Sequence, residues 1–381
     1  MTKTDFGPLP GSTILNAVAG QKTIVMAANI RIASVAQGIF RAAKDTDSAV
    51  FMELARSECD LKGGYTGLTP QAFSKRMSED AKAVGFDVWA LHADHITVKK
   101  GDAAEVEGTK QLIDAQIAAG YTSFAIDASH LFNFEGKNVR EELEPNIRVT
   151  TDLARYIKNK MNGKEFGLEV EVGEIGRKDG SGLVLTKPEE AVTFIRALNE
   201  AGVFPNVLAI ANGSTHGHTY DALGNVVEQL SIDIPQTKAI AQALRDNKLN
   251  VGIAQHGITG TPRDLINLHF PKGDIIKGNV GTFWQDVVFS TLKVYEPELY
   301  KNIQAWTLEK YRPLNAGKSD RQVFDGNCKM AIKEFYKDLY SLPAETEHAI
   351  RSMAYAESLV FFRAFGAYGS ASLVRKDIQK K

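Results

Sequence analysis

The sequence predicts an α/β protein: a closed (β/α)8 TIM barrel followed by a C-terminal helical extension. Short apolar stretches alternate with helical stretches, which is the pattern of parallel βαβ units. Eight such apolar stretches occur in the 381 residues, and eight units of this kind close a barrel. After residue 282 the strand-like stretches stop and only helical patterns remain.

The eight expected strands are short and mainly apolar, as strands buried on both faces of a parallel sheet are. They are Thr23–Ala28, Ala49–Leu54, Asp87–Leu91, Thr122–Asp127, Gly167–Val172, Asn206–Ala211, Asn250–Gln255 and Asp274–Gly278. The helical stretches between them include Thr109–Ala119, Asn146–Met161, Glu189–Ala201 and Ile234–Asp246. An open doubly wound sheet is the alternative. It would place a Gly-rich phosphate loop after the first strand, and Ala28–Arg31 is not such a loop.

The chain is predicted to divide at the end of the eighth strand. Residues 1–282 would form the barrel, which carries any catalytic site, and residues 283–381 a helical extension that makes a subunit contact. Helices are expected over Phe283–Trp306, Asn327–Leu342 and Ala344–Phe365, with the terminal Arg375–Lys381 loosely held.

Composition argues against several classes of partner. Lys and Arg total 45 and Asp and Glu 46, so no strong net charge attracts nucleic acid or an anionic membrane surface. No apolar run reaches the roughly 18 residues of a membrane span, and the N-terminus lacks the pattern of a secretory signal. The two cysteines, Cys59 and Cys328, have no metal-ligand spacing and fit a reducing compartment. We therefore expect a cytoplasmic protein.

Histidines follow three of the expected strands. His95 follows the third, His216 the sixth and His256 the seventh. In a (β/α)8 barrel the carboxyl ends of the strands meet at the active site, so these imidazoles should converge. Three protein ligands with an open position are typical of catalytic zinc. We predict one Zn2+ ion per subunit, with Glu171 at the end of the fifth strand as a fourth ligand. A single such histidine would more often be structural, but three at aligned strand ends argue against that explanation.

Two residues beside His95 have separate predicted roles. Asp94 would lie near the open coordination position, where a carboxylate suits general acid/base catalysis. Its alternative role is a helix cap or a partner that orients a ligand. His92 would point away from His95 if the strand continues, and so would support the site without binding the metal.

Glycine-rich loops follow the sixth, seventh and eighth strands and predict an anion site. They offer backbone N–H groups and hydroxyls at the start of helices, and the loops after strands seven and eight commonly bind phosphate in barrels. The predicted phosphate-binding residues are Gly217, Gly257, Thr259, Gly260, Gly281 and Thr282. Ordinary tight turns are the alternative interpretation of the same glycines.

Five motifs occur in order over roughly residues 20–295. They are Leu91-His-Ala-Asp-His95, Leu168-Glu-Val-Glu-Val-Gly173, Asn212-Gly-Ser-Thr-His-Gly217, Gln255-His-Gly-Ile-Thr-Gly260 and Ile276-Lys-Gly-Asn-Val-Gly-Thr282. Through them the sequence resembles the class II, zinc-dependent fructose-bisphosphate aldolases and their relatives acting on tagatose bisphosphate. The resemblance implies the same three zinc ligands, Glu171 as a carboxylate near the metal, Asp94 as the catalytic acid, and Asn279 in contact with substrate near the bond that breaks. It also implies a monovalent cation, Na+ or K+, at the phosphate loops.

The implied activity is a reversible, metal-dependent aldol cleavage in glycolysis and gluconeogenesis by a homodimer or homotetramer. The expected substrate is fructose 1,6-bisphosphate, giving dihydroxyacetone phosphate and glyceraldehyde 3-phosphate. Another ketose phosphate is an alternative, either tagatose bisphosphate or a sulfonated analogue. A non-catalytic barrel subunit that stabilises a partner aldolase is a further alternative, because Gly63–Pro70 resembles a loop of such subunits.

The sequence departs from the family pattern at three places. Gly281 stands where the family usually has Asp, and Arg177-Lys-Asp179 stands where a mobile loop usually carries Glu. The C-terminal arginine that grips the distal phosphate has no clear counterpart. Phe324 falls at its position, with Arg321 three residues earlier. The distal phosphate ligand is therefore unassigned.

Overall fold

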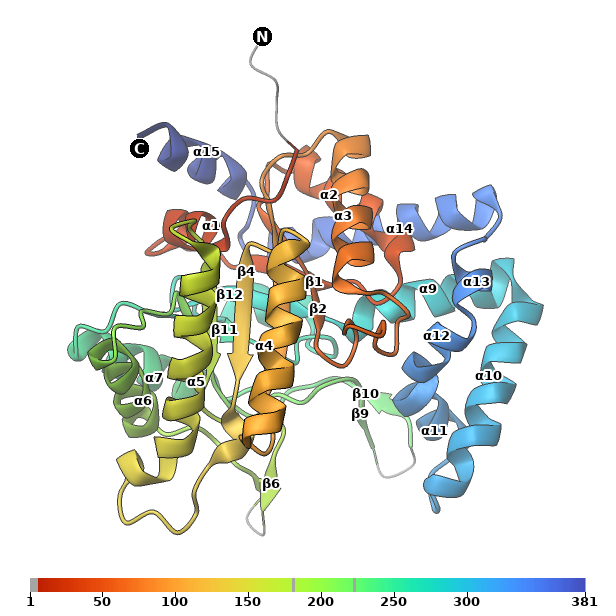
Figure 1. The fold of residues 1–381 in the computed structure, drawn as a ribbon. Coiled ribbons are helices and arrows are strands. Elements are labelled where there is room, and N and C mark those ends of the chain that lie inside the picture. Colours follow the sequence, from red (N-terminus) through yellow and green to blue (C-terminus); the bar gives the residue numbers. More distant parts are fainter. Residues whose placement is uncertain (1–5, 180–181, 222–223, 381) are drawn as a thin grey trace.

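The computed structural model of the chain describes residues 6–179, 182–221 and 224–380. Eight parallel strands close into one barrel in the order β1-β12-β11-β8-β5-β4-β3-β2 (Figure 1). They are β1 Val25–Asn29, β2 Val50–Ala55, β3 Trp89–Thr97, β4 Ser123–Asp127, β5 Gly167–Glu171, β8 Val207–Ala209, β11 Gly252–Gln255 and β12 Ile275–Val280. Each overlaps one of the eight expected stretches, so the predicted fold is confirmed.

Helices follow the strands and surround the barrel. They are α2 Ala36–Asp45, α3 Pro70–Val84, α4 Ala103–Ala118, α5 Val139–Met161, α6 Pro188–Glu200, α7 Ile234–Asp246 and α8 Arg263–His269. The four helices expected from the sequence are present. Two of them, α4 and α5, begin earlier than predicted, because Asp102 and Asn138 cap first turns that bury no side chain against the core.

A short helix, α1 Gly11–Val18, packs at the amino ends of the strands. The Leu9 amide donates to the Trp89 carbonyl and the Gly11 amide to the Thr122 carbonyl. A Cβ on Gly11 would lie 2.6 Å from the Ser123 Cβ, so this close approach requires glycine. Because α1 covers the amino ends, the carboxyl ends are the open mouth of the barrel.

The extension consists of α9 Thr282–Tyr295, α10 Pro297–Tyr311, α11 Asp320–Asn327, the 3-10 turn η4 Cys328–Met330, α12 Ala331–Glu334, α13 Tyr336–Leu339, α14 Ala344–Ala364 and α15 Ser370–Lys380. The single helix expected over Phe283–Trp306 is divided at Glu296, because Pro297 starts a new helix. The helix expected over Ala344–Phe365 is confirmed as α14, which packs against α2, α8 and α9.

The expectation that Arg375–Lys381 is loosely held was wrong for the described residues. They continue α15, which packs against α1. Arg375 lies 2.7 Å from an oxygen of Asp47 and 2.6 Å from an oxygen of Asp87. These partners lie far away in the sequence, so no local pattern could reveal them. Lys381 lies outside the described residues.

A hairpin links the barrel mouth to the extension. Its strands, β9 Thr219–Tyr220 and β10 Val226–Val227, follow the loop after β8 and reach α11 (Figure 1). The Tyr220 hydroxyl donates to Asp325 at 3.3 Å. Part of the extension therefore borders the open end of the barrel.

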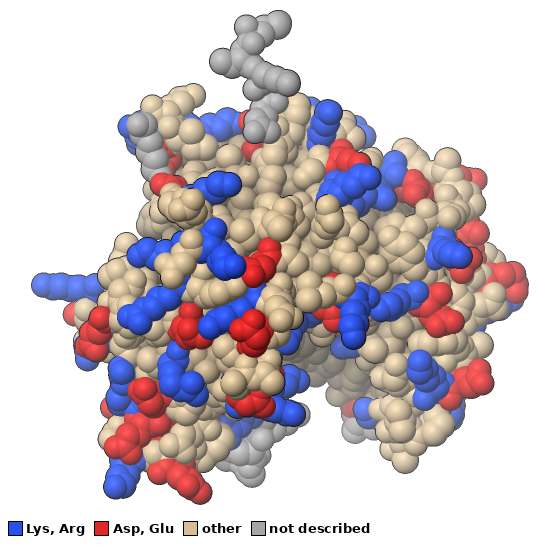
Figure 2. Space-filling view, in the orientation of Figure 1, with Lys and Arg blue, Asp and Glu red and all other residues tan. Residues whose placement is uncertain are grey.

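Acidic and basic side chains are interspersed over the face shown in Figure 2, in keeping with the balanced composition. None of the described helices is long and apolar enough to cross a membrane.

Candidate active site and metal centre

The third strand carries Asp94 and His95 in an irregular segment. Strict alternation would place neighbouring residues on opposite faces of β3. The pairing of β3 with β4 shifts register between Ala93 and Ile96, and His95 has a left-handed φ of 36°. This bulge brings two consecutive side chains to the same site, a use of bulges that is common beside active sites.

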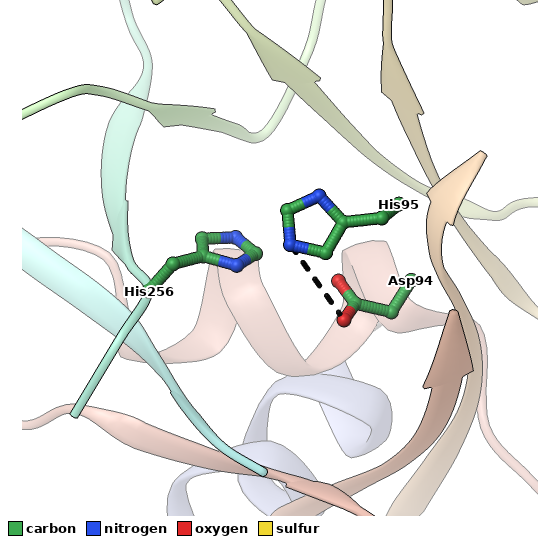
Figure 3. Close-up of side chains that lie close together, drawn as sticks. All are labelled: Asp94, His95 and His256. Carbon is green, nitrogen blue, oxygen red and sulfur yellow. Dashed lines mark ion pairs between the residues drawn. The ribbon is translucent and has the colours of Figure 1, made fainter. Parts of the chain in front are cut away.

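The three predicted histidines come together above the barrel. The ring centroids of His95 and His256 are 4.4 Å apart, those of His95 and His216 5.4 Å, and those of His216 and His256 6.3 Å. Figure 3 shows Asp94, His95 and His256 converging from two strands. Asp94 and the three histidines, His95, His216 and His256, line a cavity of about 670 Å³ at the carboxyl ends of the strands.

Carboxylates approach both nitrogens of His95. Asp94 Oδ2 lies 4.0 Å from Nε2, whereas Glu171 Oε2 lies 3.2 Å and Asp127 Oδ2 3.6 Å from Nδ1. Two adjacent donor sets result, Asp94–His95–His256 and His95–Asp127–Glu171, each with ligand atoms within 4.8 Å of one another. Glu171 therefore lies beside His95 on the side away from Asp94, and it shares a donor set with Asp127 and not with His216 or His256.

The acidic surroundings shift the pKa values of these groups. Burial opposes protonation of His95, but Asp94, Asp127 and Glu171 together raise its pKa well above the usual range. Burial, followed by the charge of Asp127, raises the pKa of Glu171 to about 8. Burial and then the neighbouring His95 lower the pKa of His256, so that this imidazole stays neutral. A neutral imidazole is the form that binds a metal.

A buried ionic network lies directly beneath the histidines, and the sequence did not reveal it. At its centre Lys277 Nζ is 2.8 Å from Glu169 Oε2 and 3.2 Å from Glu53 Oε2. Glu169 Oε1 in turn is 2.7 Å from His256 Nε2. All of these side chains are buried. The available signal was a charged residue inside three of the expected strand stretches: Glu53 in Ala49–Leu54, Glu169 in Gly167–Val172 and Lys277 in Asp274–Gly278.

Asn279 connects this network to Asp94. Its Nδ2 donates to Asp94 Oδ1 at 3.2 Å and to Glu53 Oε1 at 2.8 Å, and its Oδ1 accepts from Lys277 at 3.0 Å. The amide orientation is thereby fixed. His92 lies deeper, where Nδ1 is 2.7 Å from the Ser123 hydroxyl, away from the cavity that His95 lines.

Five of the six predicted phosphate-binding residues line the cavity. They are Gly217, Gly257, Thr259, Gly281 and Thr282. Gly260 is not among the lining residues, and its carbonyl accepts from the Gln229 amide. A Cβ on Gly257, whose φ is 67°, would lie 2.7 Å from the Thr215 carbonyl oxygen, so this turn requires glycine. Thr282 begins α9, so a helix N-terminus lies at the cavity, where the Phe283 amide donates to the Thr259 hydroxyl at 3.2 Å.

The three departures from the family pattern lie in different surroundings. A Cβ on Gly281 would be 3.5 Å from Arg31 Nη2. Phe324 is buried in α11 against Phe289 and Tyr300, and Arg321 pairs with a carboxylate of its own helix, so neither lines the cavity. Asp179 lies in β6 Lys178–Asp179, and its side chain is outside the described part of the chain.

The comparison with known families decides the assignment. A family model described as fructose-bisphosphate aldolase class-II matches residues 10–343. The chain belongs to this family. The family's enzymes are lyases and are typically metal-dependent.

Individual relatives are distant. The D-tagatose-1,6-bisphosphate aldolase subunit GatZ of Salmonella paratyphi B is 33% identical over 91 residues, 22% of this chain and 22% of that protein. The match thus spans about a fifth of the curated relative. A fructose-bisphosphate aldolase structure from Campylobacter jejuni has a TM-score of 0.61 and 18% identity, covering 96% of this chain and 97% of that one. The YdjI aldolase of Escherichia coli K12 has a TM-score of 0.57 and 16% identity, covering 95% and 99%. At these identities the two structures support the fold alone.

The donor set fits a divalent metal. Among the described residues, His95 Nε2 is buried without a hydrogen-bond partner, a costly state unless a ligand satisfies it. Imidazole nitrogens with a carboxylate suit zinc and other first-row divalent ions. Glu169, bound to His256 Nε2, is the type of carboxylate that orients a metal-binding histidine.

Proposed function

We propose that this protein is a zinc-dependent class II aldolase that reversibly cleaves a ketose bisphosphate, with fructose 1,6-bisphosphate as the leading candidate. One observation carries the proposal: three imidazoles and Asp94 converge in a cavity whose rim offers glycine-rich turns and a helix N-terminus. The products would be dihydroxyacetone phosphate and glyceraldehyde 3-phosphate.

Each part of the site has a role in such a reaction. A divalent ion held by His95, His216 and His256 would supply Lewis-acid polarisation of the substrate ketone. Asp94 removes the C4 hydroxyl proton as the C3–C4 bond breaks, and returns it in condensation. Asn279 orients Asp94 through its 3.2 Å hydrogen bond. The backbone N–H groups of the glycine-rich loops hold the C1 phosphate, where Na+ or K+ would also bind.

Schiff-base chemistry is disfavoured by the state of Lys277. A Schiff-base lysine needs an unprotonated amine and a lowered pKa. Burial opposes the charge of Lys277, but Glu169 and Glu53 overcome it and raise its pKa above the usual range. The amine is therefore held as a cation by two carboxylates.

A non-catalytic role beside a partner aldolase is the second candidate. It is suggested by the GatZ match and by the loop over Gly63–Pro70. A purely supporting subunit has no need for three converging imidazoles with an aspartate, which favours catalysis. Activity of the purified chain alone separates the two candidates.

The experiment combines metal analysis with cleavage assays. The protein is purified, its metal is quantified, and dihydroxyacetone phosphate release is measured from fructose and tagatose 1,6-bisphosphates with and without EDTA. The proposal expects about one zinc per subunit and cleavage that EDTA abolishes and zinc restores. Full activity after complete metal removal would reject the mechanism. Light scattering on the same sample tests the further proposal of a homodimer or homotetramer.

A further inference from the structure

A second cavity lies beside the barrel mouth, between the loop after β2 and the helical extension. Its volume is about 790 Å³, which is within the range of sites that bind small molecules. Its described lining includes neither Asp94 nor any histidine nor a glycine-rich loop of β8, β11 or β12. Ser57, Asp60, Tyr65 and Lys329 line both cavities. A ligand in the second cavity would therefore lie next to the barrel mouth and not over the proposed metal centre.

One wall of the second cavity comes from the loop Gly63–Pro70 and the residues just before it. This loop is fixed against the extension. A Cβ on Gly67, whose φ is 82°, would lie 2.7 Å from Cδ2 of Tyr336 in α13, so the close approach requires glycine. The Lys333 ammonium of α12 also donates to the Lys62 carbonyl at 2.9 Å. The cavity between the loop and the extension is therefore a built part of the fold.

Lysines give this cavity its charge. The lysines that line it are Lys62, Lys310, Lys329 and Lys333. In the described part of the chain, none of their ammonium groups forms an ion pair with a carboxylate. Two acidic residues, Asp60 and Glu334, line the cavity as well. Asp60 Oδ1 already accepts from the Lys62 and Gly64 amides at 2.7 and 2.8 Å. Four positive charges against two negative ones leave a net attraction for anions.

Aromatic rings form the opposite wall. Trp306 and Tyr311 of α10 have ring centroids 6.1 Å apart and planes inclined at 60°, and Met330 lies in the same lining. Nε1 of Trp306 and the Tyr311 hydroxyl have no hydrogen-bond partner among the residues that the structure describes. The Lys310 ammonium lies 4.6 Å from the Trp306 centroid. A cation over an exposed ring is a weak contact, so this ring can accept a planar ligand instead.

The combination of rings and cations narrows the class of ligand. A bare inorganic anion would use the lysines and leave both rings without a role. A long nucleic acid needs a wider basic surface than this balanced composition supplies. A small molecule that carries both a planar ring and phosphate groups uses the two walls together, because bases stack on aromatic side chains while lysines neutralise phosphates.

We propose that this second cavity, the lysine–tryptophan pocket, binds a nucleoside phosphate. The base lies against Trp306 and Tyr311, and the phosphates lie among Lys62, Lys310 and Lys329. Lys333 holds the loop through the Lys62 carbonyl. The inference goes beyond the proposed aldolase function and does not depend on it, because no residue assigned to the metal or to proton transfer takes part.

Calorimetry with ATP in excess Mg2+ tests the pocket directly, since magnesium keeps the nucleotide from chelating a bound zinc ion. ATP is compared with tripolyphosphate, with adenosine and with a short single-stranded DNA. Stacking of the base predicts that ATP binds at least about fivefold more tightly than tripolyphosphate. The lysines predict that adenosine binds more weakly than ATP.

Tryptophan fluorescence locates the bound base. Trp306 is partly exposed, whereas the other two tryptophans, Trp89 and Trp284, are buried. ATP should therefore quench the emission of Trp306, with the same Kd as in calorimetry. In Trp306→Phe the quenching should disappear, while calorimetry still detects ATP because phenylalanine keeps a ring for stacking.

A matched pair of charge variants completes the test. The double variant Lys62→Met with Lys310→Met removes two charges of the pocket, and Lys337→Met removes an exposed charge outside it. Two exposed ion pairs predict about a tenfold loss of ATP affinity in the double variant, against less than about twofold in Lys337→Met. Neither Lys62 nor Lys310 lines the barrel mouth, so cleavage of sugar bisphosphates should be unchanged.

Several results would overturn the pocket. They are no saturable ATP binding at millimolar concentration, equal affinities for ATP and tripolyphosphate, tighter binding of the DNA, and equal losses in the double variant and Lys337→Met. Saturable ATP binding with the expected variant effects, in a protein that cleaves no ketose bisphosphate, would reject the proposed function and leave the pocket standing.

Discussion

Replacing Lys277 with methionine removes the ammonium that lies between the buried carboxylates of Glu53 and Glu169. Methionine keeps the length of the side chain but not its charge. Lys277 lies 2.8 Å from Glu169 and 3.2 Å from Glu53, and all three side chains are almost completely buried. Removing one partner of a buried ion pair costs about 3–5 kcal/mol, because the remaining charge is left without compensation.

Thermal unfolding measures this loss. An unfolding entropy of about 2.1 cal/mol/K per residue gives roughly 0.8 kcal/mol/K for the 381 residues. The expected fall in Tm at about pH 8 is therefore roughly 4–6 °C. A second variant, Lys277→Met with Glu53→Gln, should recover part of it, because one of the two uncompensated charges is gone.

The fall in Tm caused by Lys277→Met should depend on pH in a definite direction. Burial, Asp94 and Glu169 already raise the pKa of Glu53 well above its usual range, and Lys277 is the group that opposes this rise. Without Lys277 the carboxyl prefers its neutral form in the folded state more strongly. Stability from a raised carboxyl pKa is present at low pH and is lost as pH rises above the unfolded pKa. The Tm deficit should therefore shrink as pH is lowered from about 8 toward 5.5.

Two outcomes would refute this account. The first is a fall in Tm of less than about 1 °C at pH 8, which would show that the ammonium contributes little. The second is a deficit that widens as the pH falls. Lys337→Met, at an exposed position, is the matched control and should leave Tm unchanged within about 1 °C.

The remaining predictions concern the chemistry of single side chains. Asp94→Ala should lower cleavage by at least about 10²-fold while zinc content is retained, as metal analysis and initial rates on one sample would show. Sodium borohydride with dihydroxyacetone phosphate should not inactivate the protein, because Lys277 is held as a cation; covalent trapping seen by mass spectrometry would contradict this. Burial raises the pKa of both Cys59 and Cys328 to about 12. Neither thiol should therefore react with Ellman's reagent in the native state, whereas both should react in guanidinium.

The barrel could be predicted because its strands obey a simple physical rule. A strand covered on both faces is largely apolar, and eight such stretches could be recognised without knowledge of any contact. The extension was harder to predict. The division between α9 and α10 depends on Pro297. The last helix, α15, is held in place through the ion pairs of Arg375 with Asp47 and Asp87, which lie more than two hundred residues earlier in the sequence.

The candidate site also has a part that could be predicted from the sequence and a part that could not. The three histidines could be placed together because the carboxyl ends of all barrel strands meet at one mouth. The ionic network beneath the histidines could not be predicted, because a single lysine or glutamate within a strand does not reveal its partner. Lys277 and Glu169 become neighbours only when the barrel closes.

His95 shows why even a correctly chosen residue had unpredictable geometry. The sequence suggested that β3 ends before Asp94 and His95, so that both side chains were free to turn to the site. The strand instead continues to Thr97, and both side chains face the site only because the backbone at His95 adopts a φ of 36°. Such a conformation costs a non-glycine residue on the order of 1–3 kcal/mol and persists only where surrounding contacts enforce it. Those contacts are the 3.2 Å and 3.6 Å approaches of Glu171 and Asp127 to Nδ1, which leave Nε2 directed at Asp94 and away from other partners. The strain and the unsatisfied nitrogen thus occur at one residue, which is the arrangement expected if the fold is built to present His95 to a ligand.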